Sequence, residues 1–149
     1  MLVKGDILES NCNIICHQVN LQGVMGGGLA FQIAKKYPEC EKQYKDFVAK
    51  NKNILGGKVF FYKIDDSHYI ANCFSQNENF DTNYKWVAEC ANTVNLWAKM
   101  HNLEEVAIPY GYGCGIANGN WNIVGSLWER FISDAELIKF LYMGEGIRI

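Results

Sequence analysis

Hydrophobic positions in this chain change their spacing after residue 20, and the change predicts a strand followed by a helix. An apolar run predicts a buried strand over 14–19. Beyond residue 27, apolar residues recur at helical spacing, at Leu29, Ile33 and Tyr37, which predicts a helix over 27–37. The segment between them is polar and rich in glycine, so the strand leads through a glycine loop into the helix.

The same reading predicts further elements along the chain. Strands are expected at 1–3, 106–109 and 137–142, a hairpin over 58–64 and 69–74, and helices at 38–50, before residues 101–102, and at 121–131. Pro38 suits a first helical position. Asp81 or Thr82 is expected to cap the long helix that ends near 101–102, and Asn120 the helix that follows.

Strands that alternate with helices indicate an α/β domain with helices on both faces of a mainly parallel sheet. The hairpin makes that sheet mixed, and we expect one domain over 1–149. A second glycine loop, YGYGCGIANGN at 110–120, also follows a strand and precedes a helix. Ligands of such sheets bind beyond the carboxyl ends of the strands, so both glycine loops are expected on one rim.

Composition narrows the function classes. Fourteen basic and sixteen acidic residues give a net charge of -2, which disfavours non-specific nucleic-acid binding. The six cysteines form no C-x-x-C pair and the three histidines are well separated, so no metal site is expected. The sequence has no signal-peptide pattern and no apolar run long enough for a membrane helix. A reducing, cytoplasmic location is the expectation.

The two glycine loops predict an anion site, although neither matches a standard nucleotide motif. The sequence contains no P-loop, and the glycine spacing differs from the Rossmann fingerprint. Either loop alone is well explained as a tight turn. Two such loops on one rim, each before a helix, favour a ligand with two phosphates or a diphosphate.

Three motifs resemble the macro domain, the ADP-ribose-binding fold, over nearly the whole chain. KGDI at 4–7 is similar to the family's opening motif, VN and MGGGLA within 19–30 to its first phosphate loop, and IP, GCGI and Trp121 to its second. His17 and Asn20, with the following glycines, resemble the ADP-ribose 1''-phosphate phosphatase type found in yeast. The M-G-x-G-[IL]-A form also occurs in hydrolases that remove ADP-ribose from glutamate or DNA.

The resemblance implies a role for each matching residue. Asp6 would bind the adenine amine, with Ile7 beside the ring and Tyr142 near the adenosine. The first loop would lie against the diphosphate and distal ribose through Gly26, Gly27 and Gly28. The second would wrap the phosphates through Gly113, Cys114, Gly115, Ile116, Ala117, Asn118 and Gly119. Asn20 would bind hydroxyls of the distal ribose, and His17 would act as acid, base or phosphate ligand.

Structural alternatives stand beside these roles. Asp6 also suits the cap of a turn, Asn20 could hold its own loop, and His17 could be a structural hydrogen-bonding residue. Tyr142 is equally well explained as core. Cys114 is interpreted as loop filler rather than as a nucleophile.

Two departures from the family bear on the reaction. Asn83 stands where the ADP-ribosyl hydrolases carry a lysine, and Lys85 is displaced by two residues. Ala117 or Asn118 stands where the glutamate-directed enzyme carries an aspartate. These differences disfavour a lysine-dependent removal of ADP-ribose.

We therefore expect a three-layer α/β/α macro domain with a mixed, mainly parallel sheet. It would bind ADP-ribose or ADP-ribose 1''-phosphate without a cofactor and hydrolyse at the distal ribose, most simply as a phosphatase. One alternative is a non-catalytic ADP-ribose reader or sequestering module. A further alternative is an ADP-ribosyl hydrolase acting on protein or DNA.

Overall fold

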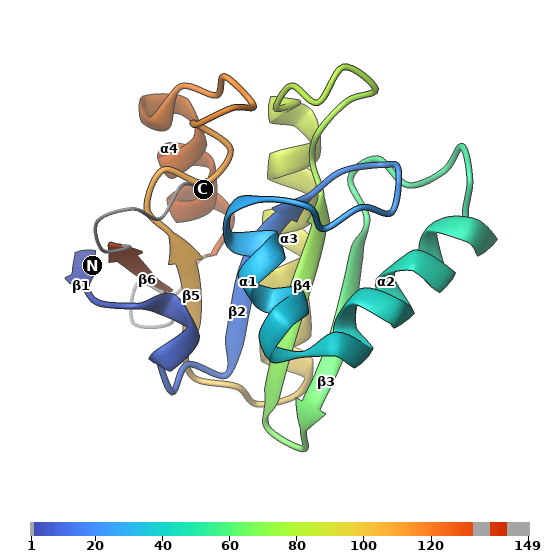
Figure 1. Cartoon of the computed structure of the whole chain (residues 1–149). Coiled ribbons are helices and arrows are strands. Elements are labelled where there is room, and N and C mark those ends of the chain that lie inside the picture. Colours follow the sequence, from blue (N-terminus) through green and yellow to red (C-terminus); the bar gives the residue numbers. More distant parts are fainter. Residues whose placement is uncertain (1, 133–137, 143–149) are drawn as a thin grey trace.

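The computed structural model describes residues 2–132 and 138–142. These residues form six strands and four α-helices, with α1 followed directly by α2 and β3 by β4 (Figure 1). Their bounds are β1 Leu2–Lys4, β2 Ile14–Val19, α1 Gly28–Lys36, α2 Pro38–Lys50, β3 Val59–Asp65, β4 His68–Phe74, α3 Tyr84–Met100, β5 Val106–Pro109, α4 Trp121–Phe131 and β6 Ile138–Tyr142. A short 3₁₀ helix, η1, spans Ile7–Glu9. The elements predicted from the sequence agree with these bounds to within a few residues.

The strands form one sheet in the order β1-β6-β5-β2-β4-β3. Neighbouring strands are parallel except β3 and β4, which form the predicted antiparallel hairpin. Helices α1 and α2 cover one face and α3 and α4 the other (Figure 1). The expected three-layer arrangement with a mixed, mainly parallel sheet is therefore confirmed.

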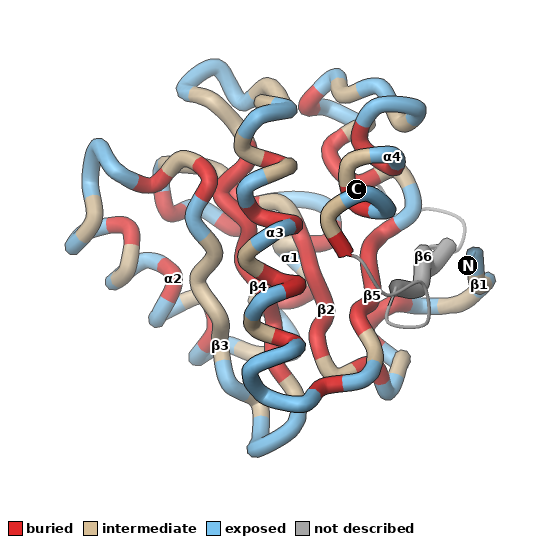
Figure 2. Tube along the Cα trace, turned by 180° about the vertical axis from the view of Figure 1, so that it is seen from behind, coloured by how far each residue is buried: buried red, intermediate tan, exposed pale blue. Residues whose placement is uncertain are grey.

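Alternate residues of the central strand β2 face opposite layers. Ile14 and Cys16 pack among residues of α3 and α4, whereas Ile15 and Val19 pack among those of α1 and α2. Buried residues accordingly run along β2, β4 and β5 from both sides, while the outer face of α3 is exposed (Figure 2). This placement of the core follows from the two-residue repeat of a strand covered on both faces.

The cap of the long helix α3 differs from the prediction. The side chain of Asn83, rather than of Asp81 or Thr82, accepts a hydrogen bond from the Trp86 amide at 3.1 Å. Asp81 and Thr82 instead lie in the loop before the helix. Asn120 caps α4 as predicted, accepting from the Asn122 amide at 2.9 Å. Within the described ranges, no helix has both the length and the apolar composition needed to cross a bilayer.

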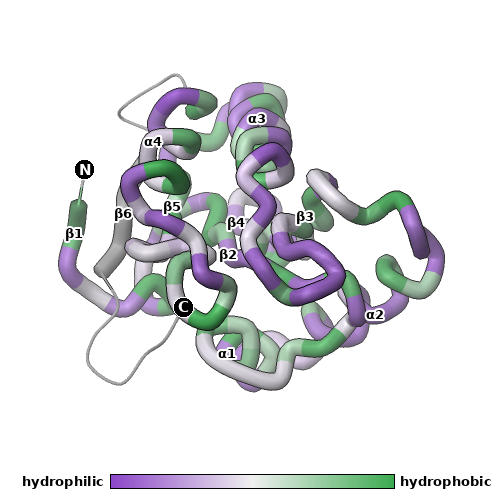
Figure 3. Tube along the Cα trace, turned by 90° about the horizontal axis from the view of Figure 1, so that it is seen from above, coloured by the Kyte–Doolittle hydropathy of each residue, from purple (hydrophilic) through white to green (hydrophobic). Residues whose placement is uncertain are grey.

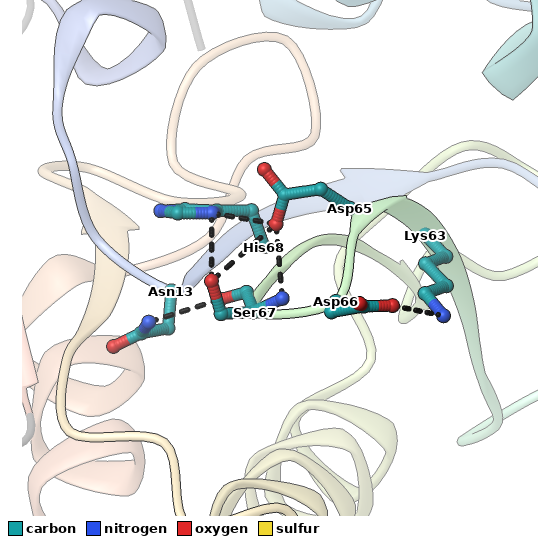
Figure 4. A network of polar contacts seen from close by, with 6 residues as sticks. All are labelled: Asn13, Lys63, Asp65, Asp66, Ser67 and His68. Carbon is teal, nitrogen blue, oxygen red and sulfur yellow. Dashed lines mark hydrogen bonds and ion pairs between the residues drawn. The ribbon is translucent and has the colours of Figure 1, made fainter.

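Asn13 joins the loops at the amino end of β2 (Figure 4). Its amide nitrogen donates to the Ser67 carbonyl at 2.9 Å, and its Oδ1 accepts from the amides of Glu104 and Glu105, both at 3.1 Å. The β3–β4 turn and the α3–β5 loop are thereby tied to β2. Asp65 and His68 complete the turn with an exposed contact of 2.8 Å. This network lies at the opposite end of the sheet from the glycine loops (Figure 1).

Candidate functional site

Three loops meet above the carboxyl ends of the central strands, at residues 20–27 after β2, 75–83 after β4 and 110–120 after β5 (Figure 3). A cavity of about 270 Å³ lies among them and the start of α1. Its lining residues are His17, Gln18, Val19, Asn20, Val24, Gly26, Gly27, Gly28, Leu29, Ala30, Gln76, Phe80, Ile116 and Ala117. Both glycine loops therefore contribute to one cavity, as the sequence predicted.

The amino end of α1 opens into this cavity without a side-chain cap. Gly27 holds the N-cap position in an extended conformation, φ -156° and ψ 165°, and Gly28 follows at φ +59°. A Cβ atom added at Gly27 would meet no atom within 4 Å. Packing within the protein thus does not require glycine at this position. The uncapped N–H groups and the positive end of the helix dipole suit an anion that approaches Gly27 closely.

Two glycines of the second loop have a different role, because Gly113 lets that loop pack against the 75–83 loop and Gly119 lets it pack on itself. A Cβ atom at Gly113 would lie 2.6 Å from the Thr82 hydroxyl, and one at Gly119 would lie 2.4 Å from the Gly113 carbonyl. The Gly119 amide donates to that same carbonyl at 2.8 Å. Gly113 and Gly119 therefore serve a close approach within the protein.

Only the tip of the second loop reaches the cavity, through Ile116 and Ala117. The other predicted phosphate contacts of this loop, at Gly113, Cys114, Gly115, Asn118 and Gly119, are not brought to the cavity wall. The amides of Cys114 and Asn118 donate within the loop, at 2.8 and 3.1 Å. The wrap of the phosphates by this loop stays a prediction, and in this structure Ile116 and Ala117 are its members that line the cavity.

The carboxamide of Asn20 holds the first loop. Its Nδ2 donates to the Val24 carbonyl at 2.8 Å, and its Oδ1 accepts from the amides of Gln22 and Val24 at 3.1 and 3.3 Å. The Tyr44 hydroxyl donates to the Asn20 carbonyl at 2.7 Å. These contacts agree with the structural alternative for Asn20, in which its side chain holds its own loop. One N–H of its amide remains for a ligand, so its contact with ribose stays a prediction.

His17 is 1% exposed, yet its ring is oriented by a defined partner. Asn72 donates to the Phe60 carbonyl at 3.0 Å, so its Oδ1 faces His17 Nε2 at 2.6 Å and accepts a hydrogen bond from it. The Nδ1 atom then carries a lone pair, and it is buried without a partner. Burial lowers the pKa of His17 from 6.5 to about 4, against a smaller raising effect of the Asn72 hydrogen bond. The imidazole is therefore neutral near pH 7, and its acceptor nitrogen Nδ1 is enclosed by the protein.

A second, more open hollow of about 780 Å³ adjoins the cavity and shares Gly28 with it. Asp6 lines this hollow while its Oδ1 accepts from the Leu8 amide at 2.9 Å, which caps η1. Ile7 is fully buried in the core, so its side chain offers no exposed surface for the predicted contact with an adenine ring. The backbone of Tyr142 pairs with Lys4 in the sheet, but the predicted contact of its side chain lies outside the described residues.

Neither a cysteine nor a lysine is among the described residues that line the cavity. Burial raises the pKa of Cys114 to about 11, so this thiol stays protonated at neutral pH. Lys85 extends along α3 toward Glu89, at 3.5 Å. No lysine or arginine occurs among the described residues that line the cavity. Across the described part of the chain, no cluster of potential metal ligands is present either.

Seven residues of the cavity wall are not among the site residues predicted from the sequence: Gln18, Val19, Val24, Leu29, Ala30, Gln76 and Phe80. Val24 and Phe80 are exposed apolar side chains, and Phe80 has a left-handed backbone at φ +64°. A turn around Asn77 holds that backbone, since the Asn77 side chain accepts from the Asn79 and Asp81 amides at 2.8 and 3.1 Å. The one signal in the sequence was that Phe80 is the single apolar residue of a polar loop.

Two curated relatives are similar in sequence. The chain is 24% identical over 168 residues to the "DNA ADP-ribosyl transferase-DNA ADP-ribosyl glycohydrolase fusion protein" of Thermosipho africanus, across 95% of this chain and 41% of that protein. It is 36% identical over 74 residues to an "ADP-ribose 1''-phosphate phosphatase" of Saccharomyces cerevisiae, across 48% of this chain and 42% of that protein. The chain thus spans less than half the length of either relative. No protein-family model matches the sequence.

Two solved structures share the fold. The macrodomain of Thermus aquaticus DarG superposes with a TM-score of 0.80 at 20% identity, covering 96% of this chain and 97% of that one. Thermosipho africanus DarTG in complex with ADP-ribose gives a TM-score of 0.81 at 24% identity, covering 99% of this chain and 42% of that one. At these identities the likeness establishes the architecture.

Proposed function

Since this chain has the macrodomain fold, we propose that it binds ADP-ribose or a close derivative and hydrolyses at the distal ribose. The favoured substrate is ADP-ribose 1''-phosphate, whose phosphate monoester would be cleaved. The observation that carries this proposal is one cavity holding both an uncapped helix amino end and a neutral, oriented histidine.

The diphosphate would lie against residues 26–30. Open space at Gly27 and the free N–H groups of the first helical turn support this assignment. The described lining residues include no cationic side chain, so backbone amides and the helix dipole would supply the electrostatic attraction. Names of both curated relatives, and the ADP-ribose in one structural neighbour, support the same ligand class.

The order of the strands gives the ligand a direction. Asp6 and its hollow follow β1, at one edge of the sheet, and adjoin the cavity at Gly28. Gln76 and Phe80 belong to the loop after β4, on the other side of β2. The adenosine would therefore lie toward Asp6 and the distal ribose toward the β4 side, near His17 and Asn20.

His17 would act as the base in the hydrolytic step. A water oxygen attacks phosphorus and forms a new P–O bond, while the bond from phosphorus to the C1'' oxygen breaks. Nδ1 of His17, which the protein encloses in this structure, would take one proton from the water, and the leaving ribose oxygen would take a proton from solvent. The Asn72 contact fixes the tautomer that leaves Nδ1 free, which is how an orienting partner prepares a histidine base.

A non-catalytic reader or sequestering module is the second candidate. The hydrogen bonds that hold Asn20 within its own loop favour it, because they spend most of that side chain's capacity. Removal of ADP-ribose from protein or DNA is a further candidate, supported by the name of the Thermosipho relative. The absence of lysine among the described lining residues weighs against a lysine-dependent form of that reaction.

Calorimetric titration with ADP-ribose, followed by assays of phosphate release from ADP-ribose 1''-phosphate, tests these candidates. We expect binding by wild type and by His17→Ala, with kcat of the variant lower by about 10²- to 10⁴-fold. Lack of binding at millimolar ADP-ribose would refute the proposed ligand. Tight binding without turnover of any ADP-ribosyl substrate would favour the reader.

A further inference from the structure

A chain of hydrogen bonds leads from the second glycine loop to Gln76 at the cavity wall. The Thr82 hydroxyl donates to the Gly113 carbonyl at 2.6 Å. Gln18 Nε2 donates to the Thr82 oxygen at 3.1 Å, and Gln76 Nε2 donates to Gln18 Oε1 at 2.9 Å. Three segments that are distant in sequence thus meet through side chains at the ends of β2 and β4.

Backbone carbonyls determine which group donates and which accepts in each of these hydrogen bonds. The Gly113 carbonyl can only accept, so the Thr82 hydroxyl donates its single proton to that carbonyl. The Thr82 oxygen must therefore accept a hydrogen bond from Gln18. The carbonyl and the hydroxyl of Ser75 lie 3.3 and 3.1 Å from the same Gln18 nitrogen. The Oε1 atom of Gln18 therefore faces Gln76, and the NH₂ group of Gln76 donates a hydrogen bond to it.

This assignment leaves Oε1 of Gln76 without a partner in the chain of hydrogen bonds. Gln76 lines the cavity on the β4 side, together with His17 and Asn20. Its backbone is also held, because Gln76 and Thr82 form an isolated β-bridge across the loop. An amide whose donor is committed presents its carbonyl oxygen as an oriented acceptor.

Building on the proposed hydrolysis at the distal ribose, we propose that Gln76 is a catalytic residue that orients the attacking water. Its Oε1 accepts a hydrogen bond from one water proton, which stays on the oxygen that becomes part of the phosphate product. The other proton passes to His17 Nδ1 as the P–O bond forms and the bond to the ribose oxygen breaks. Gln18 is the positioning residue that holds the Gln76 amide in this orientation.

Gln76→Met tests the assignment, because methionine keeps the length of the side chain and removes its amide. We expect kcat for ADP-ribose 1''-phosphate to fall by about 10- to 100-fold, as for loss of one positioned hydrogen bond. The Kd for ADP-ribose, which lacks the reacting phosphate, should change by less than about threefold. Gln43→Met, on the exposed side of α2, is the matched control and should keep wild-type kcat.

A double-mutant cycle tests the part played by Gln18. If Gln18 acts through Gln76, Gln18→Met/Gln76→Met should be no slower than the slower single variant. Multiplying losses would overturn the positioning role, and a Gln76→Met kcat within twofold of wild type would overturn the catalytic role. If Gln18→Met does not fold, as judged by thermal melting, Gln76→Met alone decides the catalytic role. A wild type that binds ADP-ribose but releases no phosphate would instead refute the proposed hydrolysis, and this assignment with it.

Discussion

At Gly27 the chain leaves open a helix end that the side chain of Ser, Thr, Asn or Asp would cap. Asp at this position would accept hydrogen bonds from the first-turn amides and place a negative charge at the positive end of α1. The extended backbone of Gly27 and the space around it accommodate such a side chain. The gain in stability and the loss of an anion site would then come from the same contact.

We therefore predict that Gly27→Asp raises the free energy of unfolding by about 0.3–1 kcal/mol and lowers ADP-ribose affinity by at least tenfold. Urea denaturation and calorimetric titration measure the two effects. Gly27→Ala, which supplies no cap, serves as the control for the added Cβ. Undiminished affinity in the aspartate variant would mean that the phosphates do not use this helix end.

The role of a residue could be predicted from the sequence where its neighbours along the chain set that role, and could not where a distant partner sets it. Asn120 caps the helix that it precedes, as predicted from its neighbours alone. Gly113 is predicted to contact a phosphate, whereas the close approach of Thr82, 31 residues away, is what requires glycine there. The same holds for His17, whose neutral state depends on burial and whose tautomer depends on Asn72. A single sequence displays neither of these contacts.

Asn13 acts at the scale of the elements, because its three side-chain hydrogen bonds reach two loops that follow other strands and helices. Asn13→Ala would remove all three, although its backbone carbonyl would still accept from the Tyr69 amide at 2.8 Å. The exposed contact between Asp65 and His68 in the same turn contributes far less, since such pairs are screened by water.

We predict that Asn13→Ala lowers the free energy of unfolding by about 1–2 kcal/mol, the value of two or three partly solvated hydrogen bonds. Asn13→Asp keeps the two acceptor contacts and should lose less. Urea denaturation with an unchanged m-value is the measurement, and ligand affinity should stay at the wild-type level because the cavity is at the other end of the sheet. Equal losses in both variants would contradict this division of the three bonds.

The order of elements was predictable because the spacing of apolar residues differs between strands and helices. The cap of α3 was not, since Asp81, Thr82 and Asn83 are all suitable capping residues in one run. Tertiary contacts resolved that choice: Thr82 is held by Gly113, and Asp81 accepts from the Asn118 side chain at 3.2 Å. Asn83 remained for the helix. Local propensity names the candidates, and packing selects among them.

For the whole molecule, the buried histidine links stability to pH. The pKa of His17 is about 4 in the folded chain against an ordinary 6.5, so the unfolded chain binds the proton more tightly. Stability from this group is fully present above pH 6.5 and is lost as the pH falls toward 4. A difference of about 2.5 units corresponds to about 3 kcal/mol.

We predict that the free energy of unfolding decreases between pH 6.5 and 4 by about 3 kcal/mol more in wild type than in His17→Gln. Glutamine retains a donor for Asn72 but does not titrate. Urea denaturation at several pH values gives the difference, in which contributions from the other acidic groups cancel. Parallel pH curves for the two proteins would show that His17 is not buried in its neutral form.

The pleat of β2 directs neighbouring side chains to opposite faces of the sheet, and this limits which changes in sequence the strand can accept. His17 and Gln18 differ by one position, so one contacts Asn72 in the sheet on the α1–α2 side and the other reaches Ser75 and Thr82. Inserting or deleting one residue upstream within the strand would exchange the two walls of the cavity in a single step. Related sequences should therefore vary in residue type along β2 but keep its length, whereas length changes should collect in the turn that Asn13 ties down.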